Sequence, residues 1–290
     1  MIYDVIIIGS GPAGIACSLY TKRAGLNTMI ISKGGSALEK AHKIQNYYGV
    51  NPDITGSELY ETGIKQAKAL GIKIINDEVI NIFKEENFKI DTVNSEYIAK
   101  KVVLATGTNR KKPTIKGIQQ FEGKGISYCA TCDAFFFRNK DVAVLGNGNY
   151  ALHEAEVLEP IANSVTILTD GKEMLENRSS DFEVIKTPIR EFRGTDTVEL
   201  IEFEDDKTKN INGVFIAEGT ASSTDLARKI GALSENDNIN VDENMQTSVN
   251  GLYACGDCTG EELQVTKAVY EGMKAGLDII NKRKEEGRKS

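Results

Sequence analysis

A short apolar strand that runs straight into a glycine-rich turn constrains the fold more than any other feature of this sequence. Residues 3–8 are largely apolar and β-branched, as in a buried parallel strand. In residues 9–14, which follow, the glycines permit a tight turn, close approach of backbone to a pyrophosphate, and close packing of helix on strand. With a helix predicted to Ala24 and a second strand over residues 28–32, the sequence indicates a Rossmann-like dinucleotide-binding unit.

A second strand-and-glycine unit begins at residues 141–148, and a helix and a further strand follow it. Only about a dozen mostly polar residues then separate Asp170 from the next strand candidate at residues 183–185, which barely meets the minimum for a helical crossover. We therefore expect an α/β fold with two Rossmann-like units. The second unit is predicted to have lost a helix and to be completed by a small sheet over residues 198–204 and 213–217.

Between the two units lies the sequence Cys129-Ala130-Thr131-Cys132-Asp133. Two thiols three residues apart can close a disulfide within one helical turn, and the carboxylate of Asp133 is near enough to exchange a proton with a leaving thiolate. Such pairs also bind metals or have no function, but no nearby second pair or histidine completes a zinc site, so we predict no metal site. Five cysteines in 290 residues do not form a disulfide scaffold, which favours a catalytic role for this pair.

Composition and charge argue against several other classes of protein. A formal net charge of −7 argues against nucleic acid as a general partner. No run approaches the roughly 18 apolar residues of a membrane span. The N-terminus enters a strand directly, without the basic and apolar regions of a signal peptide. We therefore expect a cytoplasmic protein that has no membrane partner.

The C-terminal part returns to a buried strand that is closed by a Gly256-Asp257 turn. From Gln264 onward a helix is predicted, with small and apolar residues on one stripe. Its N-terminus would stabilise negative charge, as on a reduced flavin ring. Cys255 and Cys258 form a second Cys-x-x-Cys sequence, but because they flank the Gly-Asp turn we do not interpret them as a redox pair.

On these motifs the chain resembles the low-molecular-weight thioredoxin reductases over nearly its whole length. The most specific stretch is residues 128–133 together with Phe135-Phe136 and Arg138-Asn139, shortly before the second glycine turn. The resemblance implies thioredoxin as a partner and, by analogy of fold, a homodimer. It also implies an FAD-binding domain split into residues 1–112 and 240–290, and an inserted redox domain of residues 113–239.

The resemblance also implies roles for single residues. Cys132, beside Asp133, would face the flavin and receive its electrons, and Cys129 would attack the disulfide of thioredoxin. Leu263 replaces a basic residue that is usual in the family, so one polar contact is missing. The residues expected to bind FAD are Gly9, Ser10, Gly11, Pro12, Ala13 and Gly14 at the pyrophosphate, Lys33, Gly34 and Gly35 near the adenosine, Asn46, Thr106 and Gly107 along the cofactor, Gly256 and Asp257 at the ribityl or pyrophosphate region, and Gln264 and Val265 at the flavin.

The nucleotide site of the second unit departs from the family. Where the family has a His-Arg-Arg cluster that grips the 2′-phosphate of NADPH, residues 169–174 here contain one lysine and two acids. A phosphate beside Asp170 without an arginine fork would be repelled. The bulky Tyr150 also stands at a position that the family usually fills with a small residue. The pattern resembles the ferredoxin-dependent flavin thioredoxin reductases and predicts reduced ferredoxin as the electron donor.

Two alternatives stay open. Asp170 lies where an acid could hold the ribose of NADH, so a reductase driven by NADH, or by NADPH, is the second interpretation. The third is a flavin-binding redox sensor without turnover. If ferredoxin is the donor, Arg110, Lys111 and Lys112 are predicted to help dock that acidic carrier on a chain that is itself acidic.

Overall fold

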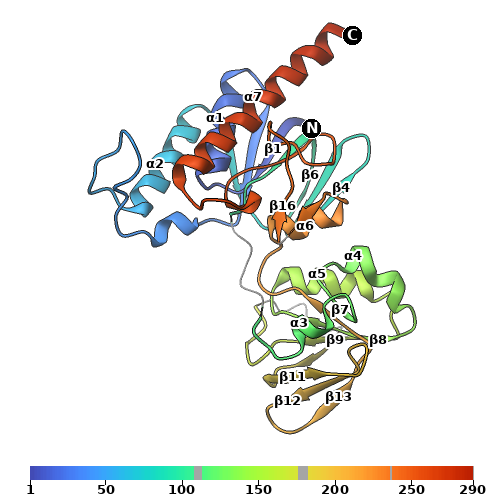
Figure 1. Cartoon of the computed structure of the whole chain (residues 1–290). Coiled ribbons are helices and arrows are strands. Elements are labelled where there is room, and N and C mark those ends of the chain that lie inside the picture. Colours follow the sequence, from blue (N-terminus) through green and yellow to red (C-terminus); the bar gives the residue numbers. More distant parts are fainter. Residues whose placement is uncertain (108–112, 176–181, 236, 290) are drawn as a thin grey trace. The chain divides into compact units, whose positions relative to one another are not determined.

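A computed structural model describes residues 1–107, 113–175, 182–235 and 237–289 of this protein. The chain forms two compact units, and the second is inserted into the first (Figure 1). Unit 1 comprises Met1–Asn109 and Ser222–Ser290, and unit 2 comprises Arg110–Ala221. Both are α/β units with parallel strands, which confirms the predicted fold class.

Unit 1 is built on a seven-stranded sheet in the order β3-β2-β1-β6-β5-β4, with β17 paired to β6. The strands are β1 (Ile2–Ile8), β2 (Thr28–Ser32), β3 (Lys73–Asn76), β4 (Val79–Lys84), β5 (Phe88–Thr92), β6 (Glu96–Leu104) and β17 (Leu252–Ala254). β1 runs parallel to both of its neighbours, β2 and β6. From Val5 to Ile8 it is buried, which explains its unbroken apolar sequence.

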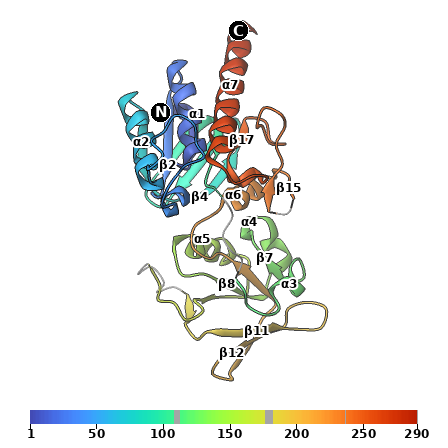
Figure 2. The ribbon, with the colours of Figure 1, turned by 60° about the vertical axis from the view of Figure 1, so that its left-hand side comes forward.

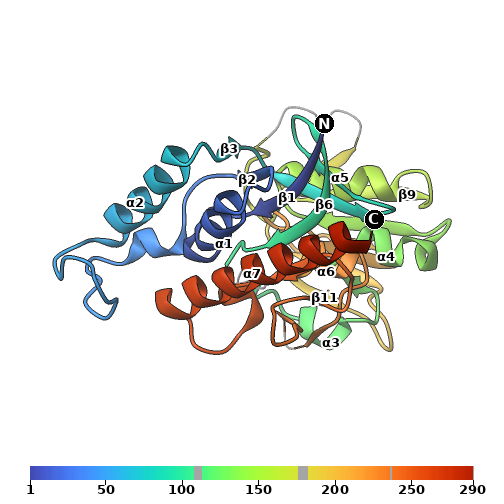
Figure 3. The same ribbon diagram turned by 90° about the horizontal axis from the view of Figure 1, so that it is seen from above.

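The helices of unit 1 are α1 (Pro12–Arg23), α2 (Gly56–Ala69), α6 (Ser223–Lys229) and α7 (Val265–Lys289), with short 3₁₀ turns η1 (Ala37–Lys40) and η4 (Asp257–Thr259) and a hairpin of β15 (Ser234–Glu235) and β16 (Asn238–Ile239). α7 lies along α1 (Figure 3). A Cβ atom at Gly272 would collide with the carbonyl oxygen of Ala13, so the two helices approach through a glycine. This contact brings the first turns of α7 to the start of α1.

Unit 2 contains a five-stranded sheet in the order β10-β9-β8-β14-β7 and an antiparallel sheet of β11-β12-β13. Its strands are β7 (Ile126–Ser127), β8 (Asp141–Leu145), β9 (Ser164–Leu168), β10 (Glu183–Ile185), β11 (Ile189–Arg193), β12 (Leu200–Phe203), β13 (Thr208–Asn210) and β14 (Gly213–Ile216), and its helical elements are α3 (Ile118–Phe121), α4 (Ala130–Asp133), η2 (Ala134–Phe137) and α5 (Asn149–Leu158). Figure 2 shows β11 and β12 of the antiparallel sheet and β8 of the parallel sheet in this unit. One buried core cluster includes Leu145 and Leu168 of the parallel sheet and Phe192 and Ile201 of the antiparallel sheet.

Two expectations differ from this arrangement. The small sheet was expected to include residues 213–217, but β14 lies between β8 and β7 of the parallel sheet. All four of its residues are buried, as in a central strand. We also expected the chain to return to the first domain near residue 240, whereas unit 1 resumes at Ser222. The physical reason is that α6 packs on β4 and Ser223 exchanges hydrogen bonds with Thr106.

The crossover after β9 bears on the predicted loss of a helix. Its described part, residues 169–175, contains no helix, and β10 pairs in parallel with β9. The crossover therefore contains no helix in the part that the structure describes.

Candidate functional site

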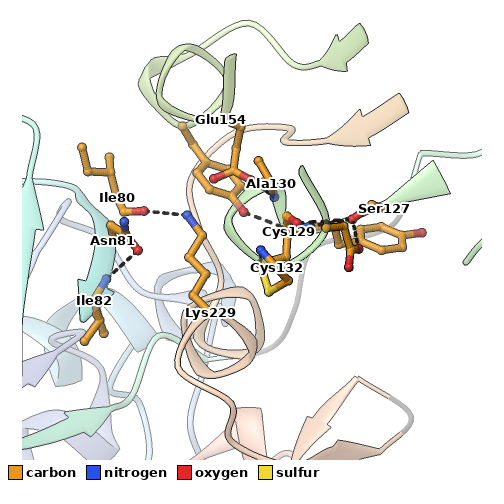
Figure 4. Close-up of a disulfide and its surroundings, with 12 residues drawn as sticks. Ile80, Asn81, Ile82, Ser127, Cys129, Ala130, Cys132, Glu154 and Lys229 are labelled. Atoms are coloured by element: carbon orange, nitrogen blue, oxygen red, sulfur yellow. Dashed lines mark hydrogen bonds between the residues drawn. A yellow bond between two sulfur atoms is a disulfide. The ribbon is translucent and has the colours of Figure 1, made fainter. Parts of the chain in front are cut away.

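The sulfur atoms of Cys129 and Cys132 form a disulfide at the start of α4 in unit 2 (Figure 4). Their Cα atoms lie 5.3 Å apart, within the usual range for bridged cysteines. Cys129 is only 4% exposed, whereas Cys132 is exposed. Of the two residues, Cys132 is therefore the more accessible to solvent.

A hydroxyl group connects this disulfide to Asp133. Ser127 Oγ donates a hydrogen bond of 2.6 Å to Asp133 Oδ2, and the backbone N–H of Cys129 donates one of 3.1 Å to the same Ser127 Oγ (Figure 4). The carboxylate is thus held by a side chain that also fixes the backbone of Cys129. Sequence reasoning identified Asp133 but not Ser127, because no sequence pattern connects the end of β7 with the last residue of α4.

A second hydrogen bond distinguishes the two sulfurs. The backbone N–H of Cys132 donates to Cys129 Sγ over 3.1 Å. In the reduced pair, this N–H would stabilise negative charge on the sulfur of Cys129. This favours Cys129 as the nucleophile, even though it is the more buried sulfur of the disulfide. The assignment of Cys132 to the flavin stays a prediction.

A buried carboxylate lies behind the pair. Glu154, on α5, is 0% exposed, and its Oε2 accepts a 2.7 Å hydrogen bond from the backbone N–H of Ala130 (Figure 4). Ala130 is the residue after Cys129, so the carboxylate contacts the backbone of the disulfide turn itself. No sequence pattern connects the two residues, because they lie 24 positions apart and meet only through packing of α5 on α4.

The turn between β1 and α1 forms a cradle in unit 1. A Cβ atom at Gly9 would collide with the carbonyl oxygen of Ala105, and one at Gly14 would collide with the carbonyl oxygen of Gly9. At Gly11 the nearest heavy atom to an added Cβ would be Ser36 Oγ at 3.5 Å. No side chain caps the start of α1, and its first turn contains no acidic residue. A helix N-terminus with unpaired N–H groups and a glycine on its approach fits a pyrophosphate.

The other predicted cofactor residues of unit 1 lie in several local contacts. The hydroxyl of Ser10 donates to Ser32 Oγ, and Lys33 pairs with Glu78 at 2.6 Å. Thr106 and Ser223 share a hydrogen bond of 2.7 Å between their hydroxyls. Gly34, Gly35 and Gly107 all have positive φ angles, which residues other than glycine rarely adopt.

Asn46 and Gln264 are 218 positions apart in the sequence, but Asn46 Nδ2 donates to Gln264 Oε1 over 2.9 Å. Gln264 directly precedes Val265, the first residue of α7. The structure therefore brings these three predicted residues together, from the loop after η1 and the start of α7.

An internal ion pair supports the Gly256-Asp257 turn. Glu271 Oε2 accepts hydrogen bonds from Gly256 N (2.7 Å) and Thr259 Oγ1 (3.0 Å). Lys267 Nζ donates to Gly256 O (3.1 Å) and Thr259 Oγ1 (2.9 Å), and it lies 3.1 Å from Glu271 Oε1. Both charged side chains are at most 12% exposed. Burial raises the pKa of Asp257, and the charge of Lys267 opposes that shift. Sequence reasoning did not identify this pair.

The glycine turn of unit 2 is tied to the chain that follows β9. Leu175 N donates to Asn147 O over 2.8 Å, and Asn147 Nδ2 donates to Glu173 O over 2.8 Å. Asp170 Oδ1 accepts from the backbone N–H of Ile189. Residues 173–175 therefore run along this glycine turn and form hydrogen bonds with the backbone carbonyl and the side-chain NH2 group of Asn147.

The cations near that turn are already paired. Lys172 pairs with Glu218, and Lys186 pairs with Glu173 at 2.5 Å. Tyr150, in the first turn of α5, is only 1% exposed and donates from its hydroxyl to Tyr128 O. Residues 169–174, all of which the structure describes, thus contain no arginine, and their one lysine is paired with Glu218.

Cys17, Cys255 and Cys258 of unit 1 are buried free thiols. Burial raises the pKa of Cys17 and of Cys258 to about 12, and it raises the pKa of Cys255 well above the ordinary value. Cys258 Sγ lies 3.6 Å from Leu104 O and 3.4 Å from Cys255 O. These thiols have core environments, in agreement with the interpretation of the second Cys-x-x-Cys sequence.

Three further observations concern the described residues only. None of their helices is long and apolar enough to cross a membrane. Nowhere among them do three or more His, Cys, Asp or Glu side chains gather in a way that could hold a metal ion. Arg110, Lys111 and Lys112, the predicted docking cluster, lie outside the residues that the structure describes.

Comparison with known proteins adds to this geometry. Residues 3–272 match the family model of the pyridine nucleotide-disulphide oxidoreductases. The thioredoxin reductase of Aquifex aeolicus is 36% identical, with 96% of this chain and 92% of the relative covered. The thioredoxin reductase of Ureaplasma parvum is 35% identical, with 95% of each covered.

Two solved structures are similar over the whole chain. The atypical thioredoxin reductase TRi of Desulfovibrio vulgaris Hildenborough has a TM-score of 0.93 and 36% identity, with 98% of this chain and 99% of that chain covered. A ferredoxin-flavin thioredoxin reductase of Clostridium acetobutylicum has a TM-score of 0.73 and 34% identity, with the same coverage. The chain therefore belongs to the pyridine nucleotide-disulphide oxidoreductase family, as a homologue of its FAD-binding thioredoxin reductases.

Proposed function

We propose that this protein is a flavin-dependent thioredoxin reductase that takes electrons from reduced ferredoxin, through FAD and the Cys129–Cys132 pair, to the disulfide of thioredoxin. The single observation that carries the choice of donor is the glycine turn of unit 2. Its Asn147 is hydrogen-bonded to residues 173–175, and the neighbouring lysines are paired with carboxylates. A nicotinamide dinucleotide would have to displace these contacts and bind beside acidic groups. Similarity to the Clostridium ferredoxin-flavin enzyme supports the same donor.

The chemistry of the chain's own residues follows from the site. When bound, FAD supplies the electron pair that opens the Cys129–Cys132 disulfide. The Cys129 thiolate then attacks one sulfur of the thioredoxin disulfide, which forms a mixed disulfide and releases one thioredoxin thiolate. Asp133, held by Ser127, takes the proton of the Cys129 thiol as the attacking thiolate forms and passes that proton to the released thioredoxin thiolate. Cys132 next attacks the sulfur of Cys129, which releases the second thioredoxin thiolate and restores the internal disulfide.

An aromatic patch next to the disulfide suits a protein substrate. Phe135 and Phe136 are 71% and 67% exposed, and their rings meet edge to face with centroids 6.3 Å apart. The Arg138 guanidinium lies 5.6 Å from the Phe135 ring. Exposed aromatic and arginine side chains are the residue types that dominate protein interfaces. We assign this patch, Phe135, Phe136 and Arg138, to thioredoxin docking.

The energetics favour a donor of low potential. Plant-type ferredoxins lie near about −400 mV and thioredoxin near about −270 mV. For two electrons, this gap corresponds to about 6 kcal/mol downhill. The reaction thus needs no nicotinamide.

Anaerobic mixing with three donors tests the proposal. Purified protein is combined in turn with reduced ferredoxin, NADH and NADPH at micromolar concentration, and flavin absorbance and new thioredoxin thiols are recorded. We expect turnover with reduced ferredoxin alone. Rapid flavin bleaching and turnover with either nicotinamide would instead support the second interpretation.

The two other interpretations are weaker on the contacts described. For an NADH-dependent reductase, Asp170 would have to hold a ribose, but its Oδ1 already accepts from Ile189 N. For a sensor without turnover, the Cys129, Cys132 and Asp133 constellation would have no use. A cytoplasmic location and a homodimer remain predictions from the sequence; size-exclusion chromatography with light scattering tests the latter.

A further inference from the structure

Glu154 is a buried titratable group to which the proposed cycle gives no role. Its Oε2 accepts the backbone N–H of Ala130 over 2.7 Å, and the residue is 0% exposed. Ala130 N–H adjoins Cys129, whose sulfur carries negative charge when it attacks the thioredoxin disulfide. A backbone N–H in that place would otherwise be free to stabilise a thiolate. Because Glu154 accepts the hydrogen bond of Ala130 N–H, this N–H is not available to a thiolate, and a carboxylate lies at the same turn.

We propose that Glu154 is a positioning residue that makes the reduced Cys129–Cys132 pair a stronger reductant. Its carboxylate opposes the formation of a thiolate at Cys129, because like charges in a buried site repel. A dithiol whose thiolate is disfavoured gives up its electrons more readily to thioredoxin. The hydrogen bond from Cys132 N–H to Cys129 Sγ acts in the opposite sense, so the reducing power of the pair is a balance between the two contacts. The inference rests on the redox role proposed for this pair.

The other titratable groups near the pair would not produce the difference expected between the Glu154 variant and the parent protein. Asp133 is held by Ser127, and Tyr150 donates from its hydroxyl to Tyr128 O. These groups are unchanged when Glu154 alone is replaced, so their contributions cancel in a comparison of the two proteins. Apart from Glu154, the titratable side chains on α4, on α5 and in the turn before α4 are Tyr128, Asp133, Tyr150, His153 and Glu156.

The test measures the disulfide equilibrium without ferredoxin or thioredoxin. Holoenzyme is equilibrated anaerobically with reduced and oxidised dithiothreitol at pH 6 and pH 9, from both directions. One protein S–S bond and two dithiothreitol S–H groups are exchanged for two protein thiols and the ring disulfide, so two electrons and two protons move together. Acid quenching, alkylation in denaturant and mass spectrometry give the dithiol fraction. Failure of the proposed donor would leave this measurement unaffected.

Glu154→Gln keeps an acceptor for Ala130 N–H and removes the charge. At pH 9, where the thiolate is formed, we expect the equilibrium to move toward the dithiol about tenfold, because the charge that opposes the thiolate has been removed. At pH 6 the thiol is protonated, and we expect a change of less than about twofold. A merely structural role would change both values alike. Equal changes at the two pH values, or no change at pH 9, would overturn the inference.

Two matched variants complete the test. Glu156→Gln removes an exposed carboxylate from the same helix and should leave both equilibria unchanged. Glu154→Asp keeps the charge but shortens the side chain by one carbon, and should stay within about twofold of the parent at both pH values. A tenfold change in Glu154→Asp would assign the effect to the hydrogen bond rather than the charge, and would overturn the inference even if Glu154→Gln did not fold.

Discussion

Each unit contains a parallel sheet, a Gly-x-Gly turn and a Cys-x-x-Cys sequence, yet the two units use these features in opposite ways. In unit 1 the turn at Gly11 leads to an uncapped helix start, and Cys255 and Cys258 are buried free thiols. In unit 2 the turn at residues 146–148 is hydrogen-bonded to its own chain, and the cysteines form the disulfide. A motif therefore fixes local backbone, while the segments packed around it decide whether a ligand or a reaction can use it.

The largest expected contrast is between the cysteine pairs. Because burial raises the pKa of Cys17 and Cys258 to about 12, their thiolate population at pH 8 is about a thousandfold below that of an ordinary thiol. After anaerobic reduction, iodoacetamide at pH 8 should label Cys132 and leave the unit 1 thiols unlabelled, as read by peptide mass spectrometry. All five cysteines should react in guanidinium. Labelling of Cys255 and Cys258 at the rate of Cys132 in the folded protein would instead support the hypothesis that they form a second redox pair.

The next contrast compares the ion pairs beside the two turns. Glu271→Ala leaves Lys267 charged in a site where it is 12% exposed, so we expect the free energy of unfolding of unit 1 to fall by about 3 kcal/mol. Glu173→Ala removes the exposed pair with Lys186 in unit 2 and should lower the free energy of unfolding of unit 2 by less than about 1 kcal/mol. Urea unfolding followed by circular dichroism measures both.

A control for that comparison replaces both partners of the buried pair. Lys267→Met combined with Glu271→Gln keeps an acceptor for Gly256 N and removes both charges, so it should be less destabilising than Glu271→Ala alone. If Glu271→Ala were no more destabilising than Glu173→Ala, the ion pair would not be what holds the Gly256-Asp257 turn.

The smallest contrast tests whether only the glycine turn of unit 1 contributes to FAD binding. An added Cβ at Gly11 would have only Ser36 Oγ within 4 Å, so Gly11→Ala should fold, yet its methyl group would stand where backbone must approach the pyrophosphate. We expect about a thirtyfold weaker FAD affinity, or about 2 kcal/mol, from fluorescence titration of the apoprotein. Gly148→Ala, whose added Cβ would lie 3.4 Å from Gly219 O, should leave FAD affinity within about twofold. Equal losses would mean that the second turn also contributes to FAD binding.

Much of the architecture could be predicted because it is encoded in short segments. Strand β1, helix α1 and the glycines between them follow from local apolar patterns and backbone sterics. β14 could not be assigned in this way, because four buried residues in a row suit a central strand of either sheet until the partners are known. The return to unit 1 at Ser222 depends on the hydrogen bonds to Thr106, which lies 117 positions away from Ser223.

By itself the sequence determined the two strand-and-glycine units and the disulfide with its neighbouring Asp133, because each depends on residues a few positions apart. Only the tertiary structure placed Glu154 against the disulfide turn and Asn46 against Gln264, and tied residues 173–175 to the second glycine turn. It also buried the free thiols of Cys255 and Cys258, whose spacing in the sequence is the same as that of the bonded pair. The physical reason is that burial, and with it the pKa of a thiol or carboxyl, is set by segments far apart in the sequence, which local spacing does not specify.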